Sequence, residues 1–154
     1  MQIHRLEQRQ HLPISIDEAW AFFSSPANLD AITPPDLGFQ ITSPNLPKMH
    51  EGQIITYRVK ILPCVWVPWV TEIKCVDEGR SFIDEQRFGP YRFWHHRHTF
   101  EPGDRGVLMT DTVHYALPFG PLGSIAHAIF VRRKLEWIFG FRKTILAERF
   151  GGQA

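Results

Sequence analysis

The most regular hydrophobic pattern of the chain lies in its last long segment, residues 122–150. Apolar residues recur there every three or four positions, which is the period of one face of an α-helix. Pro121 suits the first turn of a helix, and Gly151 suits the position just past its end. We therefore predict one long amphipathic helix over this segment. Its apolar stripe consists of Ala128, Val131, Leu135, Ile138, Phe139, Ile145 and Leu146.

A second row of apolar residues flanks this stripe. It makes the apolar surface of the helix wider than a helix lying on a flat core requires. We expect a sheet curved around the helix to cover both rows. The flanking row consists of Leu122, Ile129, Phe130, Trp137 and Phe141.

The beginning of the chain predicts a strand followed by two short helices. Residues 3–12 alternate loosely between polar and apolar and are followed by Pro13, which is typical of a strand that ends at a turn. Ser15 and Glu18 have the spacing of a capping box, so a short helix should begin there. A second short helix should begin at Pro26 and end before Pro34, because proline disfavours helical geometry in the residue before it.

From Phe39 onward the pattern is that of strands separated by turn residues. Short connections favour antiparallel neighbours, and no repeat, linker or low-complexity segment interrupts them. We therefore predict an α+β fold in a single domain, 1–154, with about six antiparallel strands between the short helices and the long helix. The predicted strands are residues 39–42, 53–62, 65–76, 81–88, 91–100 and 106–115.

Composition narrows the classes of protein. With 17 basic and 16 acidic side chains the net charge is close to zero, which argues against a nucleic-acid partner. Cys64 and Cys75 are too few for a disulfide framework, and the N-terminal residues lack the apolar core of a signal peptide. No uncharged apolar run reaches the roughly 18 residues of a membrane span. We expect a soluble cytoplasmic protein, either a monomer or a homodimer.

A set of short motifs spans nearly the whole chain: residues 17–23, 26–29, 32–35, 84–86, 89–91, 94–100 and 111–120. These motifs resemble those of the SRPBCC superfamily, which includes START, polyketide cyclase and birch-pollen-allergen-like proteins. The resemblance is greatest to a bacterial branch described as ligand-binding SRPBCC proteins. It implies a helix-grip fold, in which a curved antiparallel sheet wraps around a long C-terminal helix and leaves a cavity between them. The superfamily contains carriers, receptors and enzymes, so the fold does not decide the function.

The segment 91–100 contains the residues most suited to chemistry. Side chains alternate along a strand, so Trp94, His96, His98 and Phe100 share one face, and we place that face toward the interior. By the same alternation Asp111 faces inward from the next strand. A carboxylate buried there needs partners, because an unpaired charge in a dry interior costs several kcal/mol.

Three interpretations of these residues stay open. Two histidines at positions i and i+2 of a strand have a metal-ligand spacing, with Asp111, Asp84 or Glu85 as the third ligand. The ordinary alternative, which we favour over a metal, is a buried network of His, Asp and Tyr that satisfies its own polar atoms. In the third interpretation these groups contact the polar end of a ligand. We predict no metal and no cofactor.

The segment 61–70 holds ten uncharged residues, among them two tryptophans and two prolines. Prolines exclude a regular central strand throughout, so part of the segment should form an edge or a hairpin tip. We expect its apolar side chains to fold back onto the core. The alternative is an exposed apolar lip that takes a ligand from a membrane or a carrier protein.

We predict that the protein binds or carries a small hydrophobic ligand, of lipid, polyketide or quinone type, in the internal cavity. One alternative is a cyclase, dehydratase or isomerase that uses His and Asp without a cofactor. Another is a regulatory domain that contacts a partner protein and has a vestigial cavity. We assign no catalytic residue. The predicted apolar walls are Trp69, Trp94, Phe130 and Trp137, and the predicted polar anchors are Gln86, His96, His98, Asp111 and Tyr115.

Overall fold

The computed structural model describes residues 1–44, 48–62, 64–120 and 127–151. In chain order its elements are β1 (His4–Leu12), α1 (Ile16–Phe23), the 3-10 helices η1 (Pro26–Ile32) and η2 (Pro35–Leu37), β2 (Phe39–Ile41), β3 (Ile54–Leu62), β4 (Val65–Asp77), β5 (Ser81–Phe88), β6 (Phe93–Gly103), β7 (Gly106–Ala116), the π-helical turn η3 (His127–Val131) and α3 (Arg132–Phe150). The predicted order of elements is confirmed. The predicted helical residues 122–126 and the predicted start at Pro121 lie outside the described residues.

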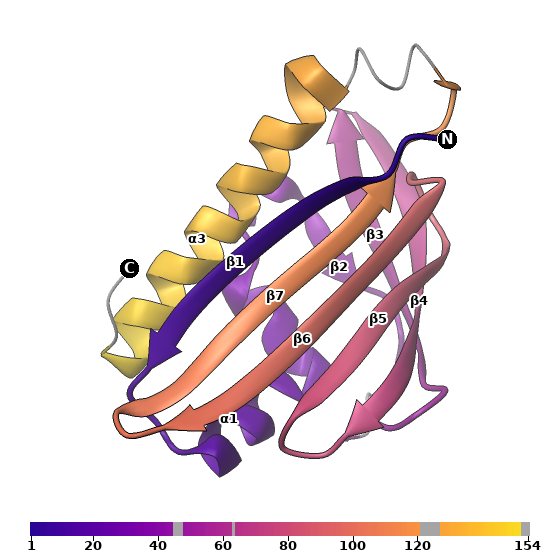
Figure 1. Cartoon of the computed structure of the whole chain (residues 1–154). Helices are drawn as coiled ribbons and strands as arrows, with labels where there is room; N and C mark the ends of the chain where they lie inside the picture. Colours follow the sequence, from indigo (N-terminus) through magenta and orange to yellow (C-terminus); the bar gives the residue numbers. More distant parts are fainter. Residues whose placement is uncertain (45–47, 63, 121–126, 152–154) are drawn as a thin grey trace.

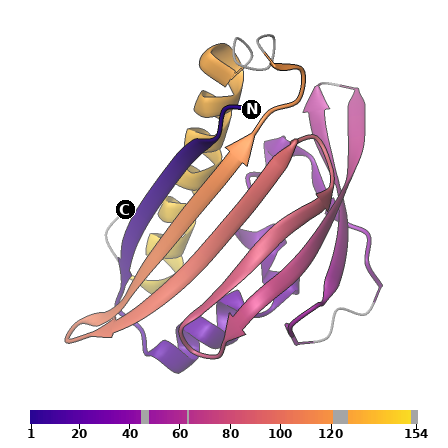
Figure 2. The same cartoon turned by 45° about the vertical axis from the view of Figure 1, so that its right-hand side comes forward.

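The strands form one antiparallel sheet of seven strands, in the order β1-β7-β6-β5-β4-β3-β2. The sheet is curved, and α3 runs along its inner side, as Figures 1 and 2 show. The short helices α1 and η1 lie near the C-terminal end of α3 (Figure 1). This arrangement is the predicted α+β helix-grip fold.

The first helix begins where the capping box predicts. The Glu18 amide donates to Ser15 Oγ over 3.2 Å, and the Ser15 amide donates to the Glu18 carboxylate over 2.9 Å. These two bonds satisfy backbone donors that a helix start leaves unpaired. They fix the turn between β1 and α1 and so direct α1 beneath the sheet.

Two glutamines attach the edge strand β1 to α3. The side-chain amide of Gln8 donates to the Phe139 carbonyl over 3.0 Å, and that of Gln10 donates to the Lys143 carbonyl over 2.8 Å. On the helix, Leu135, Phe139 and Leu146 are buried against the sheet. The helix is therefore held by an apolar stripe and by polar contacts along one edge.

The expectation that the sheet covers the flanking row of α3 is wrong for three of its residues. Ile129, Phe130 and Trp137 are 49%, 69% and 44% exposed. The sheet contacts the helix along one stripe only, so this flank faces solvent.

The helices of the described residues are each too short or too polar to span a membrane.

Candidate functional site

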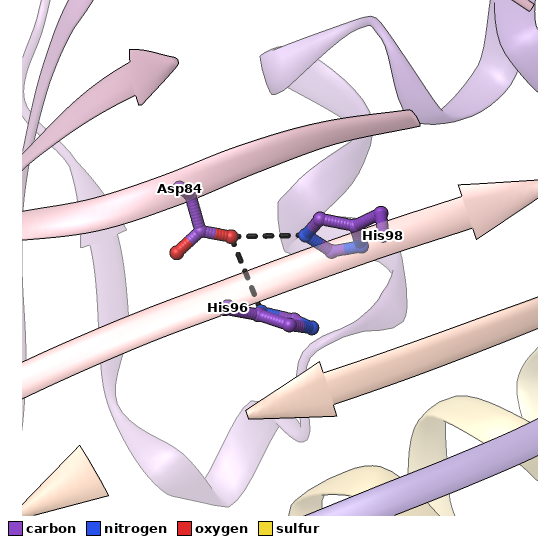
Figure 3. Close-up of side chains that lie close together, drawn as sticks. All are labelled: Asp84, His96 and His98. Carbon is purple, nitrogen blue, oxygen red and sulfur yellow. Dashed lines mark hydrogen bonds and ion pairs between the residues drawn. The ribbon is translucent and has the colours of Figure 1, made fainter. Parts of the chain in front are cut away.

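Three neighbouring strands bring four ionisable side chains together on the inner face of the sheet. Asp84 on β5 lies opposite His96 on β6, and His98 on β6 lies opposite Asp111 on β7. Residues two apart on a strand share a face, so His96 and His98 both point inward between the two aspartates. Figure 3 shows Asp84 and the two histidines facing one another. We call these residues, together with Arg142 of α3, the charged cluster.

Each imidazole of the charged cluster contacts both carboxylates. Asp84 Oδ2 lies 2.9 Å from His98 Nε2 and 3.2 Å from His96 Nδ1 (Figure 3). Asp111 Oδ1 lies 2.9 Å from His96 Nε2 and 2.8 Å from His98 Nδ1. The last contact is electrostatic, because the Asp111 oxygen lies out of line for a hydrogen bond from His98 Nδ1. All four ring nitrogens therefore face a carboxylate.

Arg142 adds a positive charge from the helix side. Its Nη1 lies 3.5 Å from Asp111 Oδ2, and its guanidinium lies 5.2 Å from the centre of the Phe139 ring. Arg142 is only 8% exposed, and among the described residues its Nε has no hydrogen-bond partner. A buried donor without a partner is uncommon in proteins and is costly.

Aromatic side chains fix the orientation of the charged cluster. Phe82 stacks on the His98 ring at 4.2 Å between centroids, and Phe139 meets the His96 ring edge-on at 5.5 Å. The Trp94 indole donates to Asp84 Oδ1 over 3.2 Å. These contacts restrict the rotation of the rings and of the Asp84 carboxylate.

The charges shift one another's pKa values. Burial by itself would lower the pKa of His96, but Asp84 and Asp111 outweigh it and raise the pKa to about 9. Burial favours the neutral form of both aspartates, yet His96 and His98 hold the pKa of Asp84 well below its usual range. Arg142 and the two histidines do the same for the pKa of Asp111. His96 is therefore protonated and both aspartates are ionised at neutral pH.

A cavity of about 70 Å³ adjoins the charged cluster on the side of α1 and η1. Most of its wall is apolar and comes from α1, η1 and strands β3 to β5. Asp84, His98 and Arg142 form a polar part of the wall. The apolar wall includes Phe22, Leu29, Ile32, Ile55, Ile73 and Phe82.

The predicted inward face of strand 91–100 is confirmed. Trp94, His96, His98 and Phe100 are all buried, and Asp111 faces them as predicted. Trp69 and Tyr115 belong with Trp94 to an aromatic cluster that packs against Leu135 and Phe139, away from the cavity wall. These two residues are therefore near the charged cluster but do not line the cavity.

Of the nine predicted ligand-binding residues, only His98 is among the described residues that line the cavity. Phe130 and Trp137 are on the exposed flank of α3. Gln86 instead holds the turn between β5 and β6: its amide nitrogen donates to the Tyr91 carbonyl over 2.7 Å, and its oxygen accepts from the Tyr91 amide over 3.2 Å. Phe130, Trp137 and Gln86 do not reach the cavity, because the sheet leaves the flank of α3 uncovered and the turn uses the Gln86 amide.

Two residues of the charged cluster are missed or underweighted by sequence reasoning. Arg142 is absent from the prediction, although it interrupts the apolar stripe of α3 between Phe139 and Leu146. A charge on the buried stripe of a helix is a signal that could have identified it. The sequence suggests Asp84 only as a possible metal ligand. Its position opposite His96 depends on the register between β5 and β6, which the sequence does not show.

The prediction that the apolar side chains of the β3–β4 hairpin tip fold back onto the core is wrong for four of them. Ile61, Leu62, Val65 and Trp66 are 40–61% exposed. The guanidinium of Arg58 lies 5.2 Å from the Trp66 ring centre. The tip is therefore an apolar surface with a basic side chain stacked on it.

Comparisons with known proteins show the fold alone. No family model and no curated protein matches the sequence. Among solved structures, TTHA0849 from Thermus thermophilus has a TM-score of 0.68 at 15% identity over 97% of each chain. Norcoclaurine synthase of Thalictrum flavum, a point mutant in complex with a transition-state analogue, has a TM-score of 0.64 at 11% identity over 96% of each chain.

Ara h 8.0201 is also similar, with a TM-score of 0.62 at 16% identity over 96% of this chain and 99% of that one. In each pair nearly the whole of both chains is superposed, so the likeness includes the sheet, the short helices and the long helix. The chain therefore has the same helix-grip fold as these structures, and the fold that the resemblance to SRPBCC proteins implies is confirmed.

Proposed function

We propose that this protein binds a small molecule with an apolar body and one oxygen that accepts a hydrogen bond, in the cavity beside the charged cluster. The observation that supports this most is Arg142, whose Nε is buried without a partner in a residue of the cavity wall. A carbonyl or carboxylate oxygen of a ligand would satisfy that donor. The apolar wall around it would accommodate the rest of the ligand.

The volume of the cavity limits the size of this ligand. Sites for drug-sized molecules enclose roughly 300–1,000 Å³, whereas this cavity encloses about 70 Å³. A molecule of lipid, polyketide or quinone size therefore requires the walls of the cavity to move. A ligand bound without such movement has only a few non-hydrogen atoms.

The arrangement favours binding over acid–base catalysis. A general base needs a free lone pair within reach of the substrate. Both nitrogens of His98 already face carboxylates, and Asp84 Oδ2 already contacts two imidazoles. Cyclase, dehydratase or isomerase chemistry stays a prediction that no contact of the charged cluster specifically supports. The norcoclaurine synthase likeness is compatible with either class, because one fold can host both binding proteins and enzymes.

The exposed hairpin tip supports the expected transient contact with a membrane or carrier protein. Apolar surface of this kind on a soluble protein often marks an interaction site. The exposed tip residues Ile61, Leu62, Val65 and Trp66 belong to β3 and β4, whereas the cavity adjoins α1 and η1. Contact at the tip would therefore be a separate event from ligand binding.

The proposal can be tested with four-carbon probes by NMR. We expect butyramide and butyrate to shift the amide resonances of η1 and β5, since each offers an oxygen to Arg142. Protonated n-butylamine, which has no acceptor, should shift none of them. Arg142→Met should lower the affinity for butyramide at least about tenfold, because one hydrogen bond to a charged group contributes roughly 1.5–3 kcal/mol.

Arg132→Met is the matched control, since the Arg132 side chain is 68% exposed on the same helix. It should leave the binding of butyramide unchanged. Equal binding of butyramide and butylamine, or equal loss of affinity in both arginine variants, would contradict the proposal. Circular dichroism of each variant separates lost binding from lost folding.

A further inference from the structure

Three donor atoms of the charged cluster converge on one point between β5 and β6. Asp84 Oδ2 is 3.2 Å from His96 Nδ1 and 2.9 Å from His98 Nε2. Figure 3 shows these groups directed at one another. Bonds of about 2.1 Å in a tetrahedral metal site place the ligand atoms roughly 3.4 Å apart. The three ligand atoms lie within 4.8 Å of one another, so adjustments of the side chains would place all of them around one metal ion.

The contacts of the two imidazoles favour a positive charge at this point. A neutral imidazole has one N–H and one lone pair. Because all four ring nitrogens face carboxylate oxygens, each neutral ring would direct a lone pair at a negative oxygen. Protonating both rings relieves this, but it places two positive rings with centroids 3.8 Å apart. One divalent ion between Asp84 and the two lone pairs relieves it without that repulsion.

Asp111 has the position of an outer carboxylate in a metal site. Metal-bound histidines usually donate their second N–H to a carboxylate, which fixes the tautomer and the orientation of the ring. His96 Nε2 lies within hydrogen-bond distance of Asp111 Oδ1, and His98 Nδ1 lies 2.8 Å from the same oxygen but out of line for a hydrogen bond. Arg142 Nη1 contacts the other oxygen of this carboxylate. The ring contacts of Phe82 and Phe139 hold the two imidazoles in this orientation.

We infer that Asp84, His96 and His98 form a buried site for one divalent transition-metal ion, zinc or iron(II). Two imidazole nitrogens and one carboxylate oxygen suit these ions. Among the described residues this is the one group of three His, Cys, Asp or Glu side chains with this convergence. Asp84 and His98 also line the cavity, so a further coordination position can be reached from it. The inference does not depend on the ligand proposed above.

Cobalt(II) tests the inference because its visible absorption reports coordination by nitrogen and oxygen. Tag-free protein is stripped with EDTA, dialysed and titrated with cobalt chloride. We expect one equivalent to bind with a visible band, and zinc chloride to displace it. Asp84→Asn and His98→Ala should each lower the cobalt affinity by at least about 100-fold. Asp111→Asn should lower it by about 10- to 100-fold, as expected for a group that orients the ligands.

The double variant His95→Ala/His114→Ala is the control. These histidines face each other across β6 and β7 on the outer face of the sheet, with ring centroids 6.2 Å apart. They are the alternative place for a surface-bound ion, and their removal should leave the stoichiometry and affinity unchanged. If the control loses the ion instead, the site proposed between β5 and β6 is wrong.

Nitrogen-15 NMR of the zinc-loaded protein gives a readout that does not depend on any variant. The geometry predicts opposite tautomers, with His96 bound through Nδ1 and His98 through Nε2. Absence of stoichiometric binding in the wild-type protein would overturn the inference, as would two doubly protonated imidazoles in the presence of zinc. Either result would mean that protons on the imidazoles, and not a metal ion, hold the charged cluster together. Neither would bear on butyramide binding, which is measured with EDTA present.

Discussion

At the scale of single residues, the buried charges depend most on Asp111. Its carboxylate contacts His96, His98 and Arg142, at distances of 2.8–3.5 Å. Desolvation offsets much of the attraction within such a buried group. Removal of one member is nevertheless costly, because the remaining charges then stay buried without compensation.

Asp111→Leu should therefore lower the free energy of unfolding by about 3–5 kcal/mol. The two histidines and Arg142 would lose their shared carboxylate, and the larger isobutyl group that replaces it cannot pair with them. Urea denaturation in the presence of EDTA measures the change. Glu78→Gln is the control, since the ion pair of Glu78 with Lys48 is exposed on both sides, and it should leave the midpoint nearly unchanged. Similar midpoints for the two variants would show that the charged cluster contributes little to stability.

Residue alternation predicts part of this cluster but not all of it. Side chains alternate strictly between the two faces of one strand, and the next strand repeats this pattern. The alternation therefore identifies Trp94, His96, His98 and Asp111. Arg142 is missed because the helical pattern is defined by its apolar residues only. Its partner lies 31 positions earlier in the chain, and no local pattern shows such a contact.

At the scale of elements, the turn between β6 and β7 is determined by a glycine. Gly106 has a φ of +116°, and a Cβ added there would overlap the carbonyl oxygen of Leu12 at the end of β1. The turn and the end of β1 thus pack backbone against backbone. Gly140 in α3 differs, because no atom of the described residues lies within 4 Å of a Cβ added there.

The two glycines should therefore respond in opposite directions to alanine. Gly106→Ala should lower the free energy of unfolding by at least about 1 kcal/mol, because alanine is strained at this φ and clashes with β1. Gly140→Ala should raise it by about 0.5–1 kcal/mol through helix propensity. Urea denaturation of both variants measures the two changes. A stabilised Gly106→Ala variant would contradict the described turn.

The order and type of the elements are predictable, because the hydrophobic repeat of a helix or strand lies within its own segment of the sequence. The ends of β5 agree with the prediction, and most other strand ends differ by one to three residues. Coverage of α3 is not predictable from its own sequence, since it depends on how far the sheet curves. Trp137 and Phe130 therefore continue the apolar pattern while facing solvent.

At the scale of the whole molecule, the charged cluster separates two apolar regions of the interior. One contains α1, Phe82 and Phe100 and adjoins the cavity. The other contains Trp94, Tyr115 and Leu135. The size of the cavity is not predictable from the sequence, because it depends on side chains from several elements. Trp69, Tyr91 and Trp94 pack on one another at 4.8–5.6 Å between ring centroids. They fill space that the sequence analysis assigns to a larger ligand.

The charged cluster also predicts how the stability of the metal-free protein depends on pH. The pKa of His96 is raised from 6.5 to about 9, so its contribution is fully present below pH 6.5 and is lost as the pH rises through 9. The pKa values of Asp84 and Asp111 are lowered from 3.8, so their contribution is present above pH 3.8 and is lost as the pH falls. Stability should therefore be greatest between these limits, near pH 5–6.

Urea denaturation at pH 5, 7 and 9 with EDTA measures this dependence. The free energy of unfolding should decrease from pH 5 to pH 9 in the wild-type protein. In His96→Gln the decrease should be smaller, because the titrating imidazole is absent. An equal decrease in both proteins would mean that groups other than His96 cause the loss of stability at alkaline pH.

A crystal structure of the protein with butyramide would show whether the cavity beside Arg142 binds ligands. We expect the butyramide oxygen within about 3.2 Å of Arg142 Nε, with the alkyl chain against Phe22 and Phe82. Butyramide bound only at the β3–β4 hairpin tip, with water at Arg142, would contradict the proposed ligand site.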